Sequence, residues 1–276
     1  MRIDLHTHTT ASDGKLEPIE LCQRAASRGV EFLSITDHDT CAAYRELGTE
    51  VHVPVQLIPG IEFSTYWQNT GIHILGLNIE LQSEALNRAI DYQQKARAAR
   101  AEQIAVRLEA HGIENSLAAV RKIAGNTYIG RPHFAQHLVN IGKVKNINAA
   151  FRKFLGPGKP GDIRRNWAPM PQVIDWIRQA GGTAVLAHPA KYGLTWTKTG
   201  ALLDAFSNAG GHGMEVISGQ QQAELTERLA RLSLDKGLLA SSGSDFHQPT
   251  EGWREVGRAT ELPSDCRPVW EQWNLE

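Results

Sequence analysis

The sequence has 276 residues, of which 41% are hydrophobic and 21% are charged, and its formal net charge is −1. These values are ordinary for a soluble globular protein, exclude a disordered chain, and give the molecule as a whole no attraction to a polyanionic partner. The three cysteines, Cys22, Cys41 and Cys266, are far apart and exclude a disulfide framework or a thiolate zinc site. No signal peptide and no apolar run of roughly 18 residues is found, so the cytoplasm is the expected location.

The predicted strands and helices alternate along much of the chain. The predicted strands are Arg2–Leu5, Glu31–Thr36, Gln56–Ile61, Ile72–Ile79, Thr183–Ala187, Met214–Ser218 and Leu238–Ser242. The predicted helices between them are Pro18–Ala26, Pro169–Gln179, Ala201–Ala209 and Gln221–Leu234. Such alternation indicates parallel βαβ units, and around seven of them favour a closed or nearly closed α/β barrel over a short open sheet.

One long connection interrupts this alternation. About a hundred residues separate Ile79 from Thr183 without a convincing strand, far more than a βαβ crossover needs. Helical patterns occur there at Ser83–His111, Asn115–Ile123, Pro132–Ile141 and Asn146–Phe154. We therefore expect a barrel formed by residues 1–95 and 165–276, with an all-helical insertion at about 96–164.

The predicted insertion also differs in charge from the rest of the chain. The segment from Lys95 to Arg165 has 14 Lys and Arg residues against four Asp and Glu residues, whereas the remainder has 15 against 26. Long helices often carry solvated charge without any function. The alternative is that the insertion forms a basic cap over an acidic, metal-holding barrel.

Histidines and carboxylates follow most of the predicted strands. His6 and His8 are two residues apart, so they point to the same face of the first strand, and Asp13 follows in the next loop. The other residues of this kind are Asp37, His38, Asp39, Glu62, His188, Asp245 and His247. His73 is an exception because it lies near the start of its strand; either that strand runs antiparallel or the predicted boundary is wrong.

These residues together predict a polynuclear metal site. A single histidine after a strand is usually an ordinary loop residue, but five or six strands that end in His, Asp or Glu are unlikely to arise by chance. In parallel α/β barrels the catalytic residues lie at the rim formed by the C-terminal ends of the strands. Imidazole and carboxylate ligands without thiolate suit Mn²⁺, Zn²⁺ or Fe²⁺. Nine or ten ligands exceed the needs of one ion, so we expect two or three. No role is assigned to the remaining histidines His52, His111, His137 and His212.

The same residues resemble the successive motifs of the PHP (polymerase and histidinol phosphatase) superfamily. The motifs are His6-Thr-His8 with Asp13, Thr36-Asp-His-Asp39, Gly60-Ile-Glu62, His188 and Asp245-Phe-His247. The resemblance covers about 1–95 and 165–276 and implies a distorted (β/α)7 barrel with a trinuclear site, for which Mn²⁺ is the favoured ion. By position it implies His6, His8, Glu62 and Asp245 for one ion, Glu62, His73 and His188 for a second, and Asp13, His38 and His247 for a third.

Within this family, the segment Gly130-Arg-Pro-His-Phe-Ala135 is similar to one subgroup, the 3′,5′-nucleoside bisphosphate phosphatases. That subgroup includes a 5′→3′ exoribonuclease that acts on 5′-phosphorylated RNA fragments. The resemblance implies a metal-dependent phosphoesterase that removes the 3′-phosphate of nucleoside 3′,5′-bisphosphates, such as 3′,5′-adenosine bisphosphate to AMP. The expected ligand is a nucleotide or short RNA, with no membrane and no obligate protein partner.

The interpretation as a metal-dependent phosphoesterase predicts catalytic and substrate-binding roles for particular residues. Glu62, Asp245 and His247 are the predicted catalytic residues, and Asp39 and His247 are candidate proton donors to the leaving oxygen. Arg131 and His133 are the predicted substrate-binding residues. Arg131 precedes Pro132, which suits the first turn of a helix, where free N–H groups favour an anion. A surface salt bridge is the plain alternative for Arg131, and a histidine at a helix start is as often incidental.

Three other functions stay open at this point. The protein could be a phosphatase for another small molecule, such as histidinol phosphate. It could be a non-catalytic RNA-binding module with a structural metal site, although such sites are usually closed to further ligands. It could also be a proofreading exonuclease domain, which in a chain of 276 residues without a polymerase region would have to act in trans.

Overall fold

The computed structural model describes residues 2–48, 53–125, 128–163, 166–249, 255–259, 261–273 and 275. His52 and the predicted boundary at 164 and 165 lie outside these residues. The chain divides into two compact units, described separately below. The first comprises Met1–Ile90 with Ala168–Glu276, and the second is Asp91–Trp167. The predicted insertion of 96–164 falls inside the second unit.

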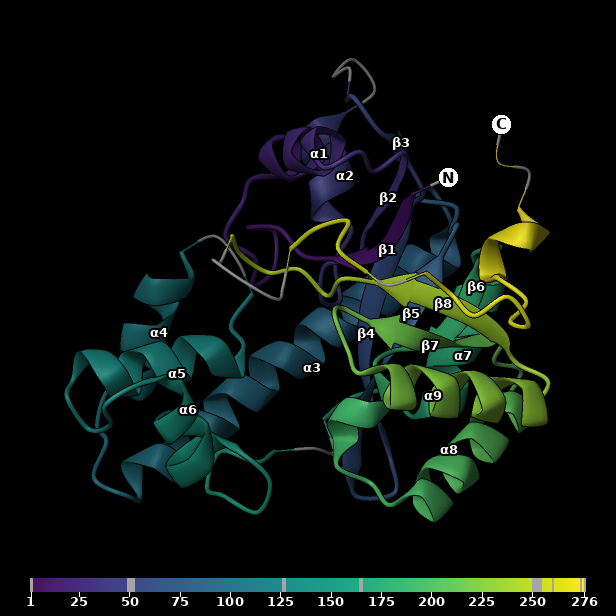
Figure 1. Cartoon of the computed structure of the whole chain (residues 1–276). Coiled ribbons are helices and arrows are strands. Elements are labelled where there is room, and N and C mark those ends of the chain that lie inside the picture. Colours follow the sequence, from purple (N-terminus) through teal and green to yellow (C-terminus); the bar gives the residue numbers. More distant parts are fainter. Residues whose placement is uncertain are drawn as a thin grey trace. The chain divides into compact units, whose positions relative to one another are not determined.

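The first unit contains eight strands within the described residues (Figure 1). They are β1 (Ile3–Thr7), β2 (Phe32–Ile35), β3 (Gln56–Leu57), β4 (Gly60–Trp67), β5 (Thr70–Leu77), β6 (Thr183–Leu186), β7 (Gly213–Ser218) and β8 (Leu239–Gly243). They form a three-stranded sheet in the order β1-β2-β3 and a five-stranded sheet in the order β4-β5-β6-β7-β8. The architecture is therefore mixed α/β, as expected.

The predicted parallel arrangement does not extend to the middle of the larger sheet, where the position of His73 had left an antiparallel strand open. β4 pairs with β5 in an antiparallel hairpin, and β5 pairs antiparallel with β6, whereas β6, β7 and β8 are mutually parallel. The predicted strand at Gln56–Ile61 is in fact the short β3 followed by the start of β4. The hairpin turn consists of Gln68 and Asn69, with Gln68 at a φ of 52°. It lacks the Asn-Gly or Asp-Gly pair that marks most two-residue hairpins.

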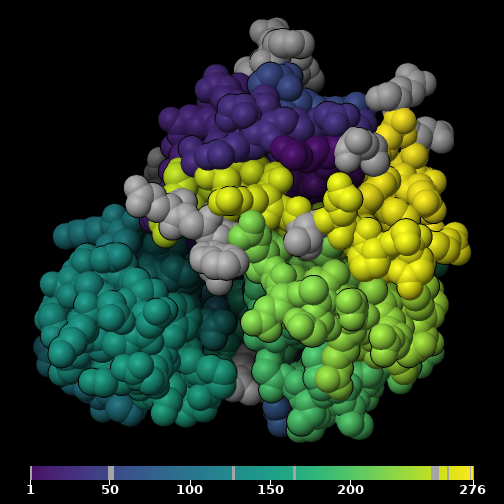
Figure 2. Space-filling model, in the orientation of Figure 1, coloured from purple at the N-terminus to yellow at the C-terminus, as the bar shows by residue number. Residues whose placement is uncertain are grey.

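Backbone hydrogen bonds join the two sheets at the C-terminal ends of the parallel strands. The N–H of His8 donates to Phe246 O at 2.9 Å, and the N–H of Asp245 donates to His6 O at 2.8 Å. The N–H of Asp39 donates to Glu62 O at 2.9 Å. Figure 2 shows the N-terminal segment of this unit, in purple, beside its C-terminal segment, in yellow. Segments distant in sequence thus converge at one end of the strands.

Helices and short helical turns connect the strands of the first unit. They are α1 (Pro18–Ser27), α2 (Ala42–Leu47), α7 (Met170–Gln179), α8 (Trp196–Asn208), α9 (Ala223–Asp235) and the 3₁₀ turns η2 (Pro189–Tyr192) and η3 (Val269–Gln272). Helix α9 packs beside β7 and β8 (Figure 1). Helix α8 begins five residues before the predicted start, after Thr195, whose hydroxyl accepts from Lys198 N. This N-cap satisfies one of the free N–H groups at the helix start.

Helices are the only regular secondary structure among the described residues of the second unit, which has its own hydrophobic core. Its elements are the greater part of α3 (Glu84–Glu109), then α4 (Ser116–Ala124), α5 (Arg131–Asn140), α6 (Ile147–Ala150) and a π-helical turn, η1 (Phe151–Leu155). Its fully buried core residues include Leu108, Val120, Phe134, Leu138 and Leu155. Burial of each such side chain contributes about 1.5–3 kcal/mol, so this segment has apolar contacts of its own.

Among the described residues, no helix combines the length and the apolar character that a membrane-crossing helix requires.

Candidate metal centre

The nine predicted metal ligands lie together in the first unit. Their ligand atoms form four overlapping sets, and within each set all atoms lie within 4.8 Å of one another. The sets are His8, Asp13, His38 and His247; His6, Glu62 and His188; His6, His8 and Asp245; and His38, Glu62 and His73. The geometry therefore brings every one of these side chains to one site, and their role as ligands remains a proposal.

His73 reaches the cluster because β5 runs antiparallel to β4. In that hairpin His73 lies opposite Ser64, two residues along from Glu62 on the same face of β4. The Nδ1 of His73 lies 2.9 Å from Glu62 Oε1. Of the two explanations for its position in the sequence, the antiparallel strand is correct.

Glu62 is at the centre of the cluster and is fully buried. Its Oε1 lies 2.9 Å from a ring nitrogen of His73 and 3.0 Å from one of His188. Its Oε2 lies 3.0, 3.3 and 3.4 Å from ring nitrogens of His38, His8 and His6. This second oxygen is buried and has no hydrogen bond of normal geometry within the described part of the chain. A buried carboxylate oxygen in that state is costly unless a cation meets it.

The distances fit ligands that share an ion. His6 Nε2 and His8 Nε2 are 3.1 Å apart, and Asp245 Oδ1 lies 3.4 and 3.5 Å from them. Two neighbouring ligand atoms that are each about 2.0–2.2 Å from one ion lie about 2.8–3.6 Å apart in octahedral or tetrahedral geometry. Imidazole nitrogens and carboxylate oxygens without sulfur are the ligands that Mn²⁺, Zn²⁺ and Fe²⁺ accept. The residues present therefore fit divalent metal ions.

Asp13 lies close to three histidines of the cluster. Its carboxylate oxygens lie 3.4 Å from His247 Nε2, 3.7 Å from His38 Nε2 and 3.8 Å from His8 Nδ1. Burial alone would raise the pKa of Asp13, but the neighbouring histidines, chiefly His38 and His247, hold it below its ordinary value. Asp13 is thus an anion at neutral pH, as a ligand must be.

The protonation states of the central groups also suit metal binding. Burial lowers the pKa of His8 to about 3, so its ring is neutral and offers a lone pair. Burial alone would raise the pKa of Glu62, but His38, His73 and His6 hold it well below its ordinary value. The buried carboxylate is therefore ionised. A neutral imidazole and an ionised carboxylate are the forms in which these two side chains bind a cation.

Glu215 is a buried residue of this site that the sequence reasoning missed. It lies in the middle of β7 and is 1% exposed. Its Oε1 lies 2.9 Å from His6 Nδ1, and its Oε2 accepts a hydrogen bond from the His188 N–H at 2.6 Å. The one available signal was a single carboxylate within the apolar run Gly213–Ser218. Glu215 fixes the ring of His6 and directs its Nε2 toward the cluster, which is the function of carboxylates behind metal-bound histidines.

Two further buried carboxylates hold the loops that carry ligands. Asp4 accepts the N–H of Ser244 at 2.8 Å and that of Gly257 at 2.8 Å. Asp37 accepts the N–H and hydroxyl of Thr9 at 2.8 and 2.6 Å and the hydroxyl of Ser12 at 2.5 Å. Burial raises the pKa of both carboxyl groups, although these hydrogen bonds oppose the shift.

The backbone at Gly243 admits no larger residue. A Cβ at this position would lie 2.4 Å from the Cβ of His6 and 2.7 Å from its backbone nitrogen. Real Cβ atoms do not approach other atoms so closely, and a backbone is unable to yield as a side chain can. Glycine therefore lets β8 pass directly beside β1, which places Asp245 next to His6.

The metal centre also includes a lysine that was not predicted from the sequence. Lys191, in η2, pairs its ammonium group with the carboxylate of Asp245, and its side chain is 40% exposed. The next residue, Tyr192, accepts the N–H of His73 at 2.9 Å and donates to Ala187 O at 2.7 Å. The tyrosine thus holds the turn against β5, and Lys191 is a positive group at the edge of the ligand cluster.

The candidate proton donors differ in their surroundings. Asp39 is fully buried, and its carboxylate accepts both the N–H and the hydroxyl of Ser64 at 2.8 Å. This engagement ties Asp39 to β4 and leaves it poorly suited to donate a proton. The side chain of His247 is 33% exposed, and its Nδ1 lies 2.9 Å from Asp245 O. His247 is the better candidate of the two.

Arg131 and His133 belong to the second unit and not to the ligand cluster. Arg131 is the first residue of α5, as its place before Pro132 predicts; its guanidinium donates to Leu155 O at 3.4 Å and lies 5.8 Å from the ring centre of Phe151. His133 Nδ1 accepts the N–H of Gly130 at 2.9 Å. His133 thus caps the start of α5, a structural role, and the contact of either residue with a substrate stays a prediction.

Known proteins resemble this chain over nearly its whole length. It is 40% identical to a 3′,5′-nucleoside bisphosphate phosphatase of Chromobacterium violaceum, over 98% of this chain and 95% of that protein. It is 42% identical to the 5′-3′ exoribonuclease Rnm of Escherichia coli, over 98% of this chain and 93% of that protein. Both names describe enzymes that hydrolyse phosphate esters of nucleotides or RNA.

A solved structure and a family model agree with these relatives. The structure is that of an amidohydrolase from Chromobacterium violaceum with bound sulfate and no metal. It matches with a TM-score of 0.88 and 38% identity, over 99% of this chain and 95% of that one. The model of the PHP domain matches residues 4–182, which include His6, His8, Asp13, His38, Glu62 and His73. The chain belongs to the PHP-domain family.

Proposed function

We propose that the protein is a metal-dependent phosphoesterase that removes the 3′-phosphate of nucleoside 3′,5′-bisphosphates, for example converting 3′,5′-adenosine bisphosphate to AMP. The observation that carries this proposal is the convergence of nine His, Asp and Glu side chains on one site. The similarity to the Chromobacterium violaceum phosphatase over 98% of the chain supports the choice of substrate. In this proposal the two sheets belong to one distorted (β/α)7 barrel, and residues 96–164 form a basic cap for the substrate.

The cluster would hold two or three divalent ions, with Mn²⁺ as the favoured metal and Zn²⁺ or Fe²⁺ as alternatives. The first ion would take His6, His8, Glu62 and Asp245, the second Glu62, His73 and His188, and the third Asp13, His38 and His247. Such ions supply a Lewis acid for the phosphoryl group and a nucleophile at neutral pH. Glu62 belongs to two of these sets, which agrees with its two carboxylate oxygens facing different histidines.

The side chains around the cluster have distinct tasks in this proposal. Glu62 and Asp245 would supply negative charge to the bound ions. Burial alone would raise the pKa of both carboxyl groups, but the surrounding histidines hold it well below the ordinary value. Lys191 lies beside Asp245 and is exposed enough to meet a phosphate oxygen. His247 would serve the third ion through Nε2, and it could hold a proton for the leaving ribose oxygen only in a state in which Nε2 is not bound to that ion. Phosphoryl transfer depends chiefly on such positioning and charge stabilisation.

The second phosphate of the substrate needs a cation, and the acidic first unit has few to offer. We assign this task to Arg131, at the start of α5, where N–H groups also favour an anion. Two further arginines of the second unit are packed against an aromatic ring. Arg97 and Arg100 are largely buried, and each guanidinium lies 5.1 Å from the ring centre of Trp167. His133 would add a weaker contact because its Nδ1 is already engaged.

A second activity, 5′→3′ removal of nucleotides from short 5′-phosphorylated RNA, is favoured by a different observation. The segment from Lys95 to Arg165 carries a net surplus of ten positive charges. Basic surfaces bind the nucleic-acid backbone without sequence preference. The Escherichia coli relative named as an exoribonuclease is 42% identical to this chain. A small-molecule phosphatase such as a histidinol phosphatase, or a non-catalytic RNA-binding protein, is the alternative.

One screen tests these functions together. The Mn²⁺-loaded protein is assayed for phosphate release from 3′,5′-adenosine bisphosphate, AMP and histidinol phosphate, and for nucleotide release from short 5′-phosphorylated RNA. We expect the bisphosphate to be hydrolysed at the 3′ position and AMP to be left intact. Preference for histidinol phosphate, or inactivity on every compound, would overturn the proposal.

A further inference from the structure

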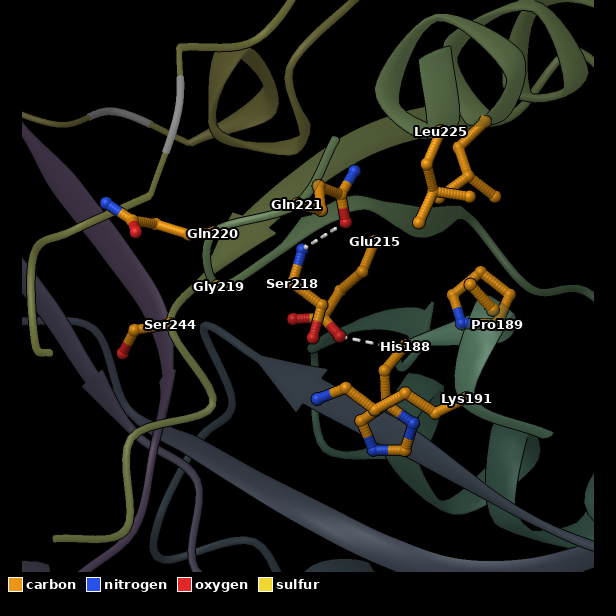
Figure 3. A pocket seen from close by; sticks show the side chains of 12 residues that line it. His188, Pro189, Lys191, Glu215, Ser218, Gly219, Gln220, Gln221, Leu225 and Ser244 are labelled. Atoms are coloured by element: carbon orange, nitrogen blue, oxygen red, sulfur yellow. Dashed lines mark hydrogen bonds between the residues drawn. The ribbon is translucent and has the colours of Figure 1, made fainter. Parts of the chain in front are cut away.

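A cavity with a volume of about 290 Å³ lies beside the metal centre, within the first unit. Its walls come from η2, from the loop between β7 and α9, and from the segment after β8. Figure 3 shows Leu225 on one side of it and Gln220 with Ser244 on the other. The cavity adjoins the ligand cluster because His188, Glu215 and Lys191 all line it. A substrate group bound there would be next to a phosphate at the metal centre.

The lining combines apolar and hydrogen-bonding groups. Leu225 and Leu229 of α9 provide the apolar part, and Gln220 provides an exposed amide. The hydroxyl of Ser218 is buried and has no hydrogen-bond partner among the described residues. A buried hydroxyl without a partner destabilises the protein, because it has lost its hydrogen bonds to water. A ligand that reaches Ser218 would remove this cost.

One neighbouring amide is not available to a ligand. The Nε2 of Gln221 donates to Val216 O at 2.7 Å and to Thr226 Oγ1 at 2.9 Å. Its Oε1 accepts the N–H of Ser218 at 3.3 Å. Gln221 is therefore a fixed part of the wall. It positions Ser218, while Gln220 keeps its own amide exposed.

The charge of the lining indicates which part of a substrate fits. Lys191 is the single cation among the residues that line the cavity, and it already pairs with Asp245. Glu215 is the single carboxylate, and it is engaged with His6 and His188. The remaining surface is neutral, so it suits a planar group with polar edges and not a second phosphate. The volume is near the lower end of the usual range for ligand pockets, about 300–1,000 Å³, which limits the occupant to one nucleoside.

We propose that this cavity binds the base and ribose of the nucleotide whose phosphate is cleaved at the metal centre. This inference rests on the proposed function and adds a subsite to it. Leu225 and Leu229 would pack against the face of the base, Gln220 would bind its polar edge, and Ser218 would bind the ribose hydroxyl. Lys191 would stand between the two subsites and meet the phosphate. The second phosphate is then recognised outside the cavity.

The test compares 3′,5′-adenosine bisphosphate with an abasic analogue, the same ribose bisphosphate without its base. For the wild-type holoenzyme we expect kcat/KM to be at least about 10-fold higher with the base present, since apolar pockets discriminate on this scale. The Leu225→Trp substitution fills the cavity and should abolish this advantage, mainly through a higher KM. The control is Leu234→Trp on the same helix, where the leucine is 43% exposed, and it should behave as wild type.

A second variant guards against a folding defect in Leu225→Trp. Gln220→Ala changes an exposed loop residue, and it should raise KM for the bisphosphate by about 3–10-fold without affecting the abasic compound, the scale of one hydrogen bond. Calorimetric binding of AMP should weaken in the same two variants. The subsite is overturned if wild type hydrolyses both compounds equally well, or if Leu225→Trp slows both to the same extent. Hydrolysis of neither compound would instead overturn the proposed function itself.

Discussion

The Nδ1 atom of His6 lies 2.9 Å from Oε1 of Glu215, and both side chains are fully buried. Burial alone would lower the pKa of His6, but Glu215, Glu62 and Asp245 raise it well above its ordinary value. Without a metal the ring is therefore protonated on both nitrogens; a bound cation would replace the proton on Nε2, and Glu215 would keep the other proton on Nδ1. One carboxylate thus determines both the tautomer and the direction of a predicted metal ligand.

The first prediction follows from this pair. Glu215→Gln should weaken Mn²⁺ affinity by about 10–100-fold, the usual cost of losing a carboxylate behind a metal-bound histidine. Calorimetric titration of the metal-free protein measures this, and circular dichroism verifies that the fold is retained. Glu224→Gln, at an exposed position on α9, is the matched control. An unchanged Mn²⁺ affinity in Glu215→Gln would show that Glu215 does not support the centre.

The second prediction concerns Glu62. Both of its oxygens face histidines, so Glu62→Gln removes the negative charge that two of the proposed ions share. We expect kcat to fall by about 10² or more, because changes behind the ligands alone cost about 10–100-fold. Glu84→Gln, where the side chain is 91% exposed, should have no effect. Near-normal kcat in Glu62→Gln at full metal occupancy would mean that Glu62 does not bridge two ions.

The third prediction concerns the second phosphate and Arg131. Arg131→Ala should reduce kcat/KM for 3′,5′-adenosine bisphosphate by about 1.5–3 kcal/mol, the contribution of a charged hydrogen bond. A 3′-phosphate substrate that lacks the 5′-phosphate should be poor for the wild type and insensitive to the substitution. Arg121→Ala, exposed on α4, serves as the control. Equal losses on both substrates would assign Arg131 to folding, through its contact with Leu155 O.

The fourth prediction is a pH dependence of stability from Glu255. The bidentate hydrogen bonds from Arg24, at 2.8 and 2.6 Å, are the main reason that the pKa of Glu255 lies below its ordinary value. A carboxylate with a lowered pKa stabilises the fold above its unfolded pKa, about 4.3, and this contribution disappears as the pH falls through the folded pKa. Glu255→Gln should therefore cost about 1 kcal/mol of unfolding free energy at pH 7.

The measurement is urea denaturation of the metal-free wild type and Glu255→Gln between pH 7 and pH 3. The histidine cluster titrates in both proteins, so it cancels in their difference. We expect the two stabilities to converge below about pH 4. A difference that stays constant down to pH 3 would show that the Arg24 pair is not its source.

Much of the candidate site could be predicted because its residues follow strand ends. In α/β folds the catalytic residues lie at the C-terminal ends of the parallel strands. Four histidines lie at or just after such an end of a predicted strand: His6, His8, His38 and His188. His73 did not fit that rule, because its strand β5 runs antiparallel to β4. The turn at Gln68 and Asn69 lacks the usual hairpin signal, so no direct sign of this hairpin is present in the sequence. The antiparallel β4 and β5 pair could therefore be suspected but not predicted.

Other parts of the site depend on contacts that no local pattern reveals. Glu215 is one polar residue in an apolar strand, which in sequence is indistinguishable from a residue on a solvated face. Lys191 reaches Asp245 only because η2 folds back after His188. The cavity beside them is likewise formed by segments after three different strands. Such long-range juxtapositions result from the tertiary fold.

The most direct test of the central claim is phosphate release from 3′,5′-adenosine bisphosphate before and after exhaustive chelation. Each sample is then titrated with Mn²⁺, and the product is identified by chromatography. We expect the chelated protein to be inactive, Mn²⁺ to restore turnover, and AMP and phosphate to form in equal amounts. Full activity of the metal-free protein, or an Mn²⁺-loaded protein that leaves the bisphosphate intact, would contradict a metal-dependent 3′-phosphatase.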